Sequence, residues 1–157
     1  MKQMTQMFDR LRPAVPLVLR VVLGGLFVYH GYDKFNGGID MVKQMFDMWG
    51  VPAPDLAAPL TAVIEIVAGA ALIVGLFTRV AATLLGLVMV GALLYVKTDI
   101  GFIATANDAM PGAELDLGLL AGLVTLMATG AGRLSVDAAA GLDSTTAEAE
   151  ERAMAST

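Results

Sequence analysis

The stretch LRVVLGGLFVYHGYDKF, residues 19–35, places an arginine, a histidine and a lysine in a largely apolar segment. At about 3.6 residues per turn, these charged residues and their neighbours fall on one narrow stripe of a helix. The stripe contains Arg20, Gly24, Phe27, Gly31 and Lys34, and His30 lies at its edge. A charge in the hydrocarbon of a membrane costs about 2.5 to 3.5 kcal/mol on insertion scales, so it usually faces a bundle interior or water. The stripe is therefore predicted to point inward in a membrane helix bundle.

The composition of the chain also favours a membrane as its surroundings. Of its 157 residues, 57% are hydrophobic and only 16% are charged, and the mean hydropathy is +0.71. A soluble domain cannot bury so much apolar surface. A membrane-spanning helix needs about 20 mostly apolar residues, and four segments come close to that length: 15–32, 57–77, 80–96 and 115–131.

These segments predict an all-α fold, an integral membrane four-helix bundle over residues 15–134. Between the first and second spans, residues 39–49 repeat apolar side chains at helical spacing, which predicts an interfacial amphipathic helix. The sequence GVPAP at 50–54 ends that helix. Residues 1–14 are expected to form a weaker amphipathic segment, and residues 135–157 a flexible acidic tail.

The basic residues predict how the bundle is oriented. Arg79 lies in the turn between the second and third spans, and Arg133 follows the fourth span. Lys2, Arg10 and Arg12 precede the first span, so all five share one side of a four-span arrangement. Because Lys and Arg accumulate on the cytoplasmic side of membrane helices, both termini are predicted to be cytoplasmic.

Several kinds of chemistry are excluded by composition. The chain has no cysteine, so it has no thiol chemistry of its own. Its single histidine excludes two-histidine haem ligation within one copy, and the usual zinc sites lack ligands. It has no basic cluster suited to nucleic acid. We therefore expect no haem, no metal and no nucleic-acid partner.

Charged side chains are expected to gather in the outer half of the bundle. Glu65 lies about two turns, roughly 12 Å, in from the outer end of the second span, so it needs a partner. His30 and Lys34 close the first span, Lys97 follows the third, and Glu114 opens the fourth. Together these residues predict a cationic and acidic pocket.

Each of these residues also has a purely structural interpretation. Arg20 can extend toward the cytoplasmic interface or pair with a carboxylate, and His30 can hydrogen-bond a neighbouring helix. The residues that can be surface charges at helix ends are Lys34, Lys97 and Glu114. Glu65 is the hardest to explain in this way, and the spacing leaves open whether Arg20 pairs with it.

Three pieces of the chain, taken together, resemble the DoxX family of small four-helix bacterial membrane proteins. They are the first-span stretch at 19–35, the run from GVPAP to EIVAGAALIVGLFTRVAA at 50–82, and ELDLGLLAGLVTLMATGAGRLSVD at 114–137. The resemblance covers residues 20–137 and implies a multi-pass protein of the bacterial plasma (inner) membrane. The family is similar to the membrane subunit of a thiosulfate:quinone oxidoreductase and includes members associated with oxidative stress and thiol homeostasis.

The leading hypothesis is a quinone-linked redox membrane subunit whose outer-half pocket binds a quinone headgroup or a small sulfur oxyanion, with quinone as the candidate cofactor. In it His30 and Glu65 are catalytic, because His30 would hydrogen-bond or protonate the quinone oxygen and Glu65 would relay a proton. The predicted ligand-binding residues are Arg20, Lys34, Lys97 and Glu114, of which the first two would stabilise negative charge.

Two other functions stay open. One is a non-catalytic membrane anchor or scaffold for soluble redox or stress-response enzymes, and the other is a small transporter or proton pathway. The expected partners are membrane lipid and a soluble redox protein, and a homo-oligomer is not excluded.

Overall fold

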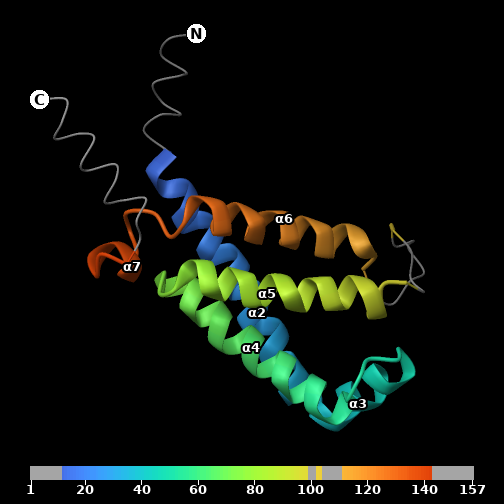
Figure 1. Cartoon of the computed structure of the whole chain (residues 1–157). Coiled ribbons are helices and arrows are strands. Elements are labelled where there is room, and N and C mark those ends of the chain that lie inside the picture. Colours follow the sequence, from blue (N-terminus) through green and yellow to red (C-terminus); the bar gives the residue numbers. More distant parts are fainter. Residues whose placement is uncertain (1–11, 99–101, 104–110, 143–157) are drawn as a thin grey trace, which may run out of the picture.

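The computed structural model describes residues 12–98, 102–103 and 111–142. Every regular element in these ranges is helical, which confirms the all-α prediction (Figure 1). The elements are η1 (Arg12–Ala14), α2 (Val15–Asn36), α3 (Ile39–Met48), α4 (Pro54–Val74), α5 (Thr78–Gly91), the π-helical turn η2 (Ala92–Val96), α6 (Ala113–Thr129) and α7 (Val136–Ala139).

Each of the four predicted spans contains one long helix. Three of them, α2, α4 and α5 together with η2, are long and apolar enough to cross a membrane. Helix α6 has 17 residues, which is at the lower end of the length that spans a bilayer. It packs beside α5 (Figure 1). The predicted all-α membrane bundle is thus confirmed.

Four helices close the bundle through pairwise packing. Helix α4 packs against both α2 and α5, and α6 packs against α5 and α2. Figure 1 shows the start of α2, the α4–α5 turn and α7 at one end of the bundle, here named the α7 end. The other end, which carries α3 and the end of η2, is named the α3 end.

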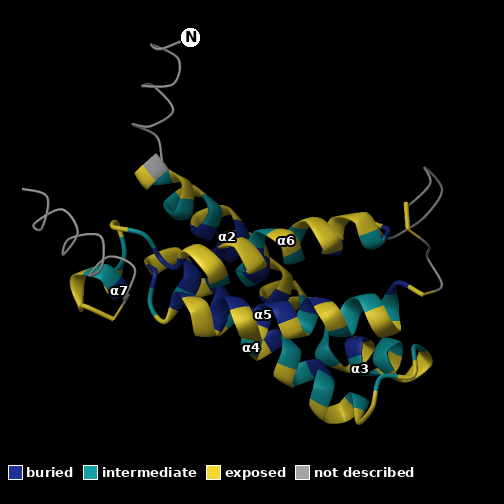
Figure 2. Cartoon of the chain, turned by 45° about the horizontal axis from the view of Figure 1, so that its top comes forward, coloured by how far each residue is buried: buried dark blue, intermediate teal, exposed yellow. Residues whose placement is uncertain are grey.

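Apolar side chains cover the outside of the long helices. Val18, Val67 and Leu87 are 59%, 62% and 64% exposed. Figure 2 shows such exposed faces in yellow along the outer sides of the helices, with the buried residues between the helices. Soluble monomers rarely expose contiguous apolar surface on this scale. The exposed faces of these helices are therefore suited to contact with lipid.

Glycines let α2 and α4 approach each other closely. A Cβ atom on Gly24 would lie 2.5 Å from the carbonyl oxygen of Gly69, and one on Gly31 would lie 2.6 Å from that of Ala62. Gly24 and Gly31 are buried together with Arg20 and Phe27. The first-span stripe therefore points inward, as its spacing predicts.

Helix α3 occupies the place of the predicted amphipathic helix. Its apolar face rests partly on the bundle, because α3 packs against α4 and Val42 is buried. Its exposed face carries Met41 and Met48, which are 61% and 76% exposed.

The bundle continues past the predicted boundary at residue 134. Helix α7 follows that residue, and Asp137 is buried because its carboxylate bonds to the α4–α5 turn. The predicted tail thus begins, over residues 135–142, with a segment that packs on the α4–α5 turn. The remainder of that tail, 143–157, and the predicted amphipathic segment before residue 12 lie outside the described residues.

Candidate functional site

At the α3 end, Lys34 of α2 forms an ion pair with Glu65 of α4. Lys34 Nζ donates a hydrogen bond to Glu65 Oε2, and the two side chains are 22% and 3% exposed. Gly31 lies about one turn before Lys34 and allows the close approach, since a Cβ atom there would be 3.0 Å from that of Glu65. The buried carboxylate therefore has Lys34 as its partner, and Arg20 does not pair with it.

A second buried pair joins the end of η2 to α6. Lys97 Nζ donates a hydrogen bond to the Pro111 carbonyl and lies 3.7 Å from Asp116 Oδ2. Lys97 and Asp116 are each 7% exposed. Asp116 Oδ2 has no hydrogen-bond partner within the described part of the chain, so its charge is balanced mainly by the nearby ammonium group.

Asp116, and not the predicted Glu114, is the carboxylate that α6 turns toward the bundle. Asp116 lies two turns before Leu123, and both residues are buried with Leu126. Glu114 is exposed, and its backbone N–H donates to the Phe102 carbonyl at 3.0 Å. Apolar residues lie on both the exposed and the buried sides of α6, so helical spacing did not distinguish Asp116 from Glu114.

His30 is exposed at the edge of the inward stripe. Its ring packs edge-to-face against Tyr29, with 6.5 Å between the ring centroids. The structure thus divides the single pocket expected from the sequence into two ion pairs, and His30 belongs to neither of them.

Arg20 lies far from this group, at the α7 end. Its side chain is fully buried and donates to the carbonyls of Leu72 and Leu134, and it interacts electrostatically with Asp137. Arg20 and Lys34 are separated by roughly 21 Å of helical rise along α2. The structure does not bring Arg20 together with the other predicted site residues.

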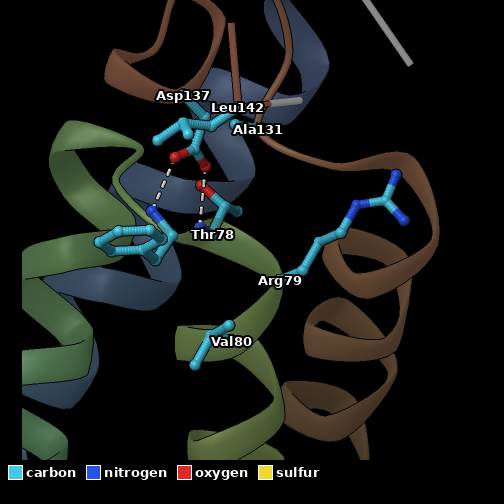
Figure 3. A pocket seen from close by; sticks show the side chains of 7 residues that line it. Thr78, Arg79, Val80, Ala131, Asp137 and Leu142 are labelled. Carbon is cyan, nitrogen blue, oxygen red and sulfur yellow. Dashed lines mark hydrogen bonds between the residues drawn. The ribbon is translucent and has the colours of Figure 1, made fainter. Parts of the chain in front are cut away.

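The α7 end is held by hydrogen bonds to Asp137 (Figure 3). Its carboxylate accepts from the backbone N–H groups of Phe77, at 2.7 Å, and Thr78, at 2.9 Å. Its own N–H donates to the Gly75 carbonyl at 2.9 Å. Gly75 has a φ of +73°, and a Cβ atom there would lie 1.8 Å from Arg20 Nη1, so only glycine fits.

A cavity of about 180 Å³ lies beside Asp137, lined in part by Thr78 and Arg79. In Figure 3 the Arg79 side chain extends away from Asp137. The start of α5 would favour an anion, but the Asp137 carboxylate already occupies that position. This end of the bundle is therefore structural in character.

At the α3 end, a groove of about 270 Å³ lies between α3, α4 and α5 with η2. Its lining is almost wholly apolar and consists of Phe46, Val51, Ala57, Thr61, Ile64, Leu84, Leu87, Val88, Gly91, Ala92, Tyr95 and Val96. Thr61 lies one helical turn before Glu65, and Tyr95 lies two residues before Lys97. The groove thus shares α4 with the Lys34–Glu65 pair and reaches the residue before Lys97, whereas Lys34 and Asp116 lie on α2 and α6, which do not line it.

The DoxX family model matches residues 15–98 of this chain, which is more than half of its 157 residues. The chain belongs to the DoxX family. The match runs from α2 to just beyond η2 and includes the Lys34–Glu65 pair and the groove of this DoxX protein. Asp116 and Asp137 lie beyond it.

Curated relatives of this DoxX protein are named as membrane proteins or as an oxidoreductase. The chain is 34% identical to the uncharacterized membrane protein Rv3486 of Mycobacterium tuberculosis over 131 residues, covering 80% of each chain. It is 35% identical to the putative oxidoreductase CatD of Bacillus subtilis over 121 residues, 77% of this chain and 83% of CatD. It is 34% identical to the inner membrane protein YphA of Escherichia coli over 77 residues, 49% of this chain and 54% of YphA. No solved structure matches the chain.

The α3 end of this DoxX protein combines two chemical capabilities. The groove can take an apolar molecule from the bilayer, and the neighbouring carboxylates and His30 can exchange protons. Among the described residues, no His, Asp and Glu side chains form a group of three that could hold a metal ion.

Proposed function

We propose that this DoxX protein is a quinone-linked redox membrane subunit, similar to that of a thiosulfate:quinone oxidoreductase, with the quinone ring in the groove at the α3 end. The observation that carries the proposal is an apolar groove that shares α4 with the buried Lys34–Glu65 pair and has Val96, the residue before Lys97 of the second pair, in its lining. Small-molecule sites are typically apolar clefts with a few polar groups, and titratable clusters in apolar surroundings are candidates for proton transfer. The name of the Bacillus subtilis relative, a putative oxidoreductase, supports a redox role.

Reduction of a quinone to a quinol takes up two electrons and two protons. Glu65 is the carboxyl group nearest to the groove along α4, so we assign it the proton relay, with Lys34 balancing its charge. His30 is the second proton donor, because it is exposed at the same end. The electrons come from thiosulfate or from a soluble partner protein. Arg20 has no direct part in this scheme, because it binds backbone carbonyls at the other end of the bundle.

The proposed location is the bacterial plasma membrane, with the α7 end in the cytoplasm. The name of the Escherichia coli relative, an inner membrane protein, supports this membrane. Arg79 lies in the first turn of α5 and Arg133 follows α6, both at the α7 end, and basic residues mark the cytoplasmic side. The groove then lies in the outer half of the bilayer.

The test is reduction of a soluble quinone analogue by the purified protein in liposomes, with thiosulfate or a cell extract as electron donor. We expect Glu65→Gln and His30→Ala each to lower the turnover number at least tenfold, in line with the contribution of a proton-transfer group, roughly a hundredfold or more. Asp55→Asn, an exposed carboxylate at the start of α4, should leave it unchanged. Absence of reduction with every donor, or equal rates in all variants, would contradict the proposal.

A membrane scaffold is the second candidate, and the exposed face of α3 favours it. Met41, Gln44 and Met48 lie on one side of α3 and are exposed, and flexible methionine side chains suit protein contacts. A scaffold predicts a stoichiometric partner that co-purifies in mild detergent and is lost from the double variant Met41→Ser/Met48→Ser. Purification of the wild-type protein without such a partner would contradict it.

A further inference from the structure

The groove between α3, α4 and α5 holds one hydrogen-bond donor that the protein itself does not use. Of the lining side chains, only those of Thr61 and Tyr95 carry a hydroxyl group. Thr61 Oγ1 donates to the Ala58 carbonyl at 2.9 Å. The Tyr95 hydroxyl has no hydrogen bond within the part of the chain that the structure describes. A ligand in the groove would therefore meet the phenol group as its free polar contact.

Tyr95 lines the groove from within the π-helical turn η2. Such turns are rare and occur frequently at functional sites. Ala92, Tyr95 and Val96 of this turn all contribute to the groove wall. Tyr95 is 37% exposed, so its ring forms part of the wall while the residue stays accessible to a molecule that enters from the bilayer.

We propose that Tyr95 is a ligand-binding residue whose hydroxyl donates a hydrogen bond to a carbonyl oxygen of a flat, apolar ligand in the groove. This inference deepens the proposed function and rests on it for the ligand class, a quinone headgroup. The remaining lining, with Phe46 and Leu87 among it, offers apolar contact to the rest of the ring. A hydroxyl group in apolar surroundings loses its bonds to water, so an acceptor on the ligand restores a favourable contact.

The single tryptophan provides a binding assay that does not depend on electron transfer. Trp49 follows α3, and its ring centroid lies 6.3 Å from that of Phe46, which lines the groove. A quinone in the groove should quench the fluorescence of Trp49. The probe is menadione, titrated against the full chain in detergent micelles. Methylnaphthalene, which has the same fused rings but no carbonyl group, serves as a competitor.

Tyr95→Phe removes only the hydroxyl group and keeps the ring. We expect it to weaken menadione binding roughly three- to tenfold, the loss of one hydrogen bond, and to leave competition by methylnaphthalene unchanged. Tyr32→Phe is the matched control, because Tyr32 is exposed on α2 and does not line the groove. Gly91→Leu should abolish saturable quenching, since a side chain there enters open space beside the groove.

Equal menadione affinity in the wild-type protein and in Tyr95→Phe would overturn the assignment of Tyr95. Equal weakening of methylnaphthalene would overturn it too, because a lost carbonyl contact cannot affect a hydrocarbon. Menadione binding that depends on Tyr95, without quinone reduction in liposomes, would support the binding site and contradict only the proposed redox function.

Discussion

Two carboxylates of this protein are buried beside lysine side chains. Glu65 beside Lys34 and Asp116 beside Lys97 each place a carboxylate near an ammonium group in the bundle. A buried ion pair gives little net stability, because both charges lose water, but removal of one partner leaves an uncompensated charge. The pairs therefore make each single substitution costly, whatever chemistry the site performs.

Lys34→Met should lower the free energy of unfolding by about 2 to 3 kcal/mol, because it leaves the Glu65 carboxylate buried alone. The double variant Lys34→Met/Glu65→Met should recover part of that loss. Lys43→Met is the control, since Lys43 pairs with Asp40 at the surface of α3, where ion pairs contribute little. Thermal unfolding in detergent measures all of them. A double variant no more stable than Lys34→Met would show that the pair does not act as one unit.

The sequence predicted the candidate site best where the position of a residue depends on a single helix. Spacing along α2 placed Arg20 and Gly31 inward, because it depends only on the helical repeat. Pairing depends on how two helices cross, so the sequence left open whether Glu65 meets Arg20, and the structure gives it Lys34 instead. Asp116 was passed over for Glu114 because both lie near the start of α6, where hydropathy alone does not define a face.

At the scale of elements, glycine contacts set the distance between α2 and α4. Gly24 faces the backbone of α4, with its missing Cβ position 2.5 Å from the Gly69 carbonyl oxygen, whereas Gly25 next to it faces open space. Membrane helices pack closely where small residues meet. An added methyl group should therefore lower the stability of the protein at Gly24 but not at Gly25.

Gly24→Ala should destabilise the protein by about 1 to 3 kcal/mol, since it forces α2 and α4 apart. Gly25→Ala, its matched control, should be neutral or stabilising by up to about 1 kcal/mol, because alanine favours the helix. Thermal unfolding followed by circular dichroism compares the two. Equal effects would mean that the close crossing of α2 and α4 does not exist in the membrane.

The α4–α5 turn depends on Asp137, which follows it by about 60 residues. Phe77 has a φ of 47°, a backbone conformation that is unfavourable for residues other than glycine. Asp137→Ala should therefore cost about 1 to 3 kcal/mol, since it leaves the buried N–H of Thr78 and the part-buried N–H of Phe77 without acceptors. Asp47→Ala, on the exposed side of α3, is the control. Unchanged thermal unfolding of Asp137→Ala would contradict this role.

For the whole molecule, hydropathy was sufficient to predict the bundle and its four long helices. Hydropathy did not predict the packing of residues 135–142 at the α7 end, because that packing depends on hydrogen bonds with a turn that is distant in the sequence. The eight residues SVDAAAGL at 135–142 are too few to carry a periodic signal. Asp137 is buried only because its carboxylate binds the backbone at the start of α5.

The orientation of the whole bundle can be measured by cysteine labelling, because the natural chain has no cysteine. Met48→Cys at the α3 end should react with a membrane-impermeant maleimide in cells whose outer envelope has been opened. Ala140→Cys at the α7 end should react only after the plasma membrane is disrupted. Both positions are exposed. The reverse pattern would place the α7 end outside the cytoplasm.

The bond from Arg20 to Leu134 joins residues 114 positions apart, and this has a consequence for biosynthesis. At about 5 to 20 residues per second, the ribosome needs roughly 6 to 23 s to make the chain between them. During that interval the first helix carries a guanidinium group without its final acceptor. Water or lipid phosphate at the membrane surface must solvate it until the segment after the last span emerges. Arg20 thus ties closure of the bundle to synthesis of the segment that follows α6.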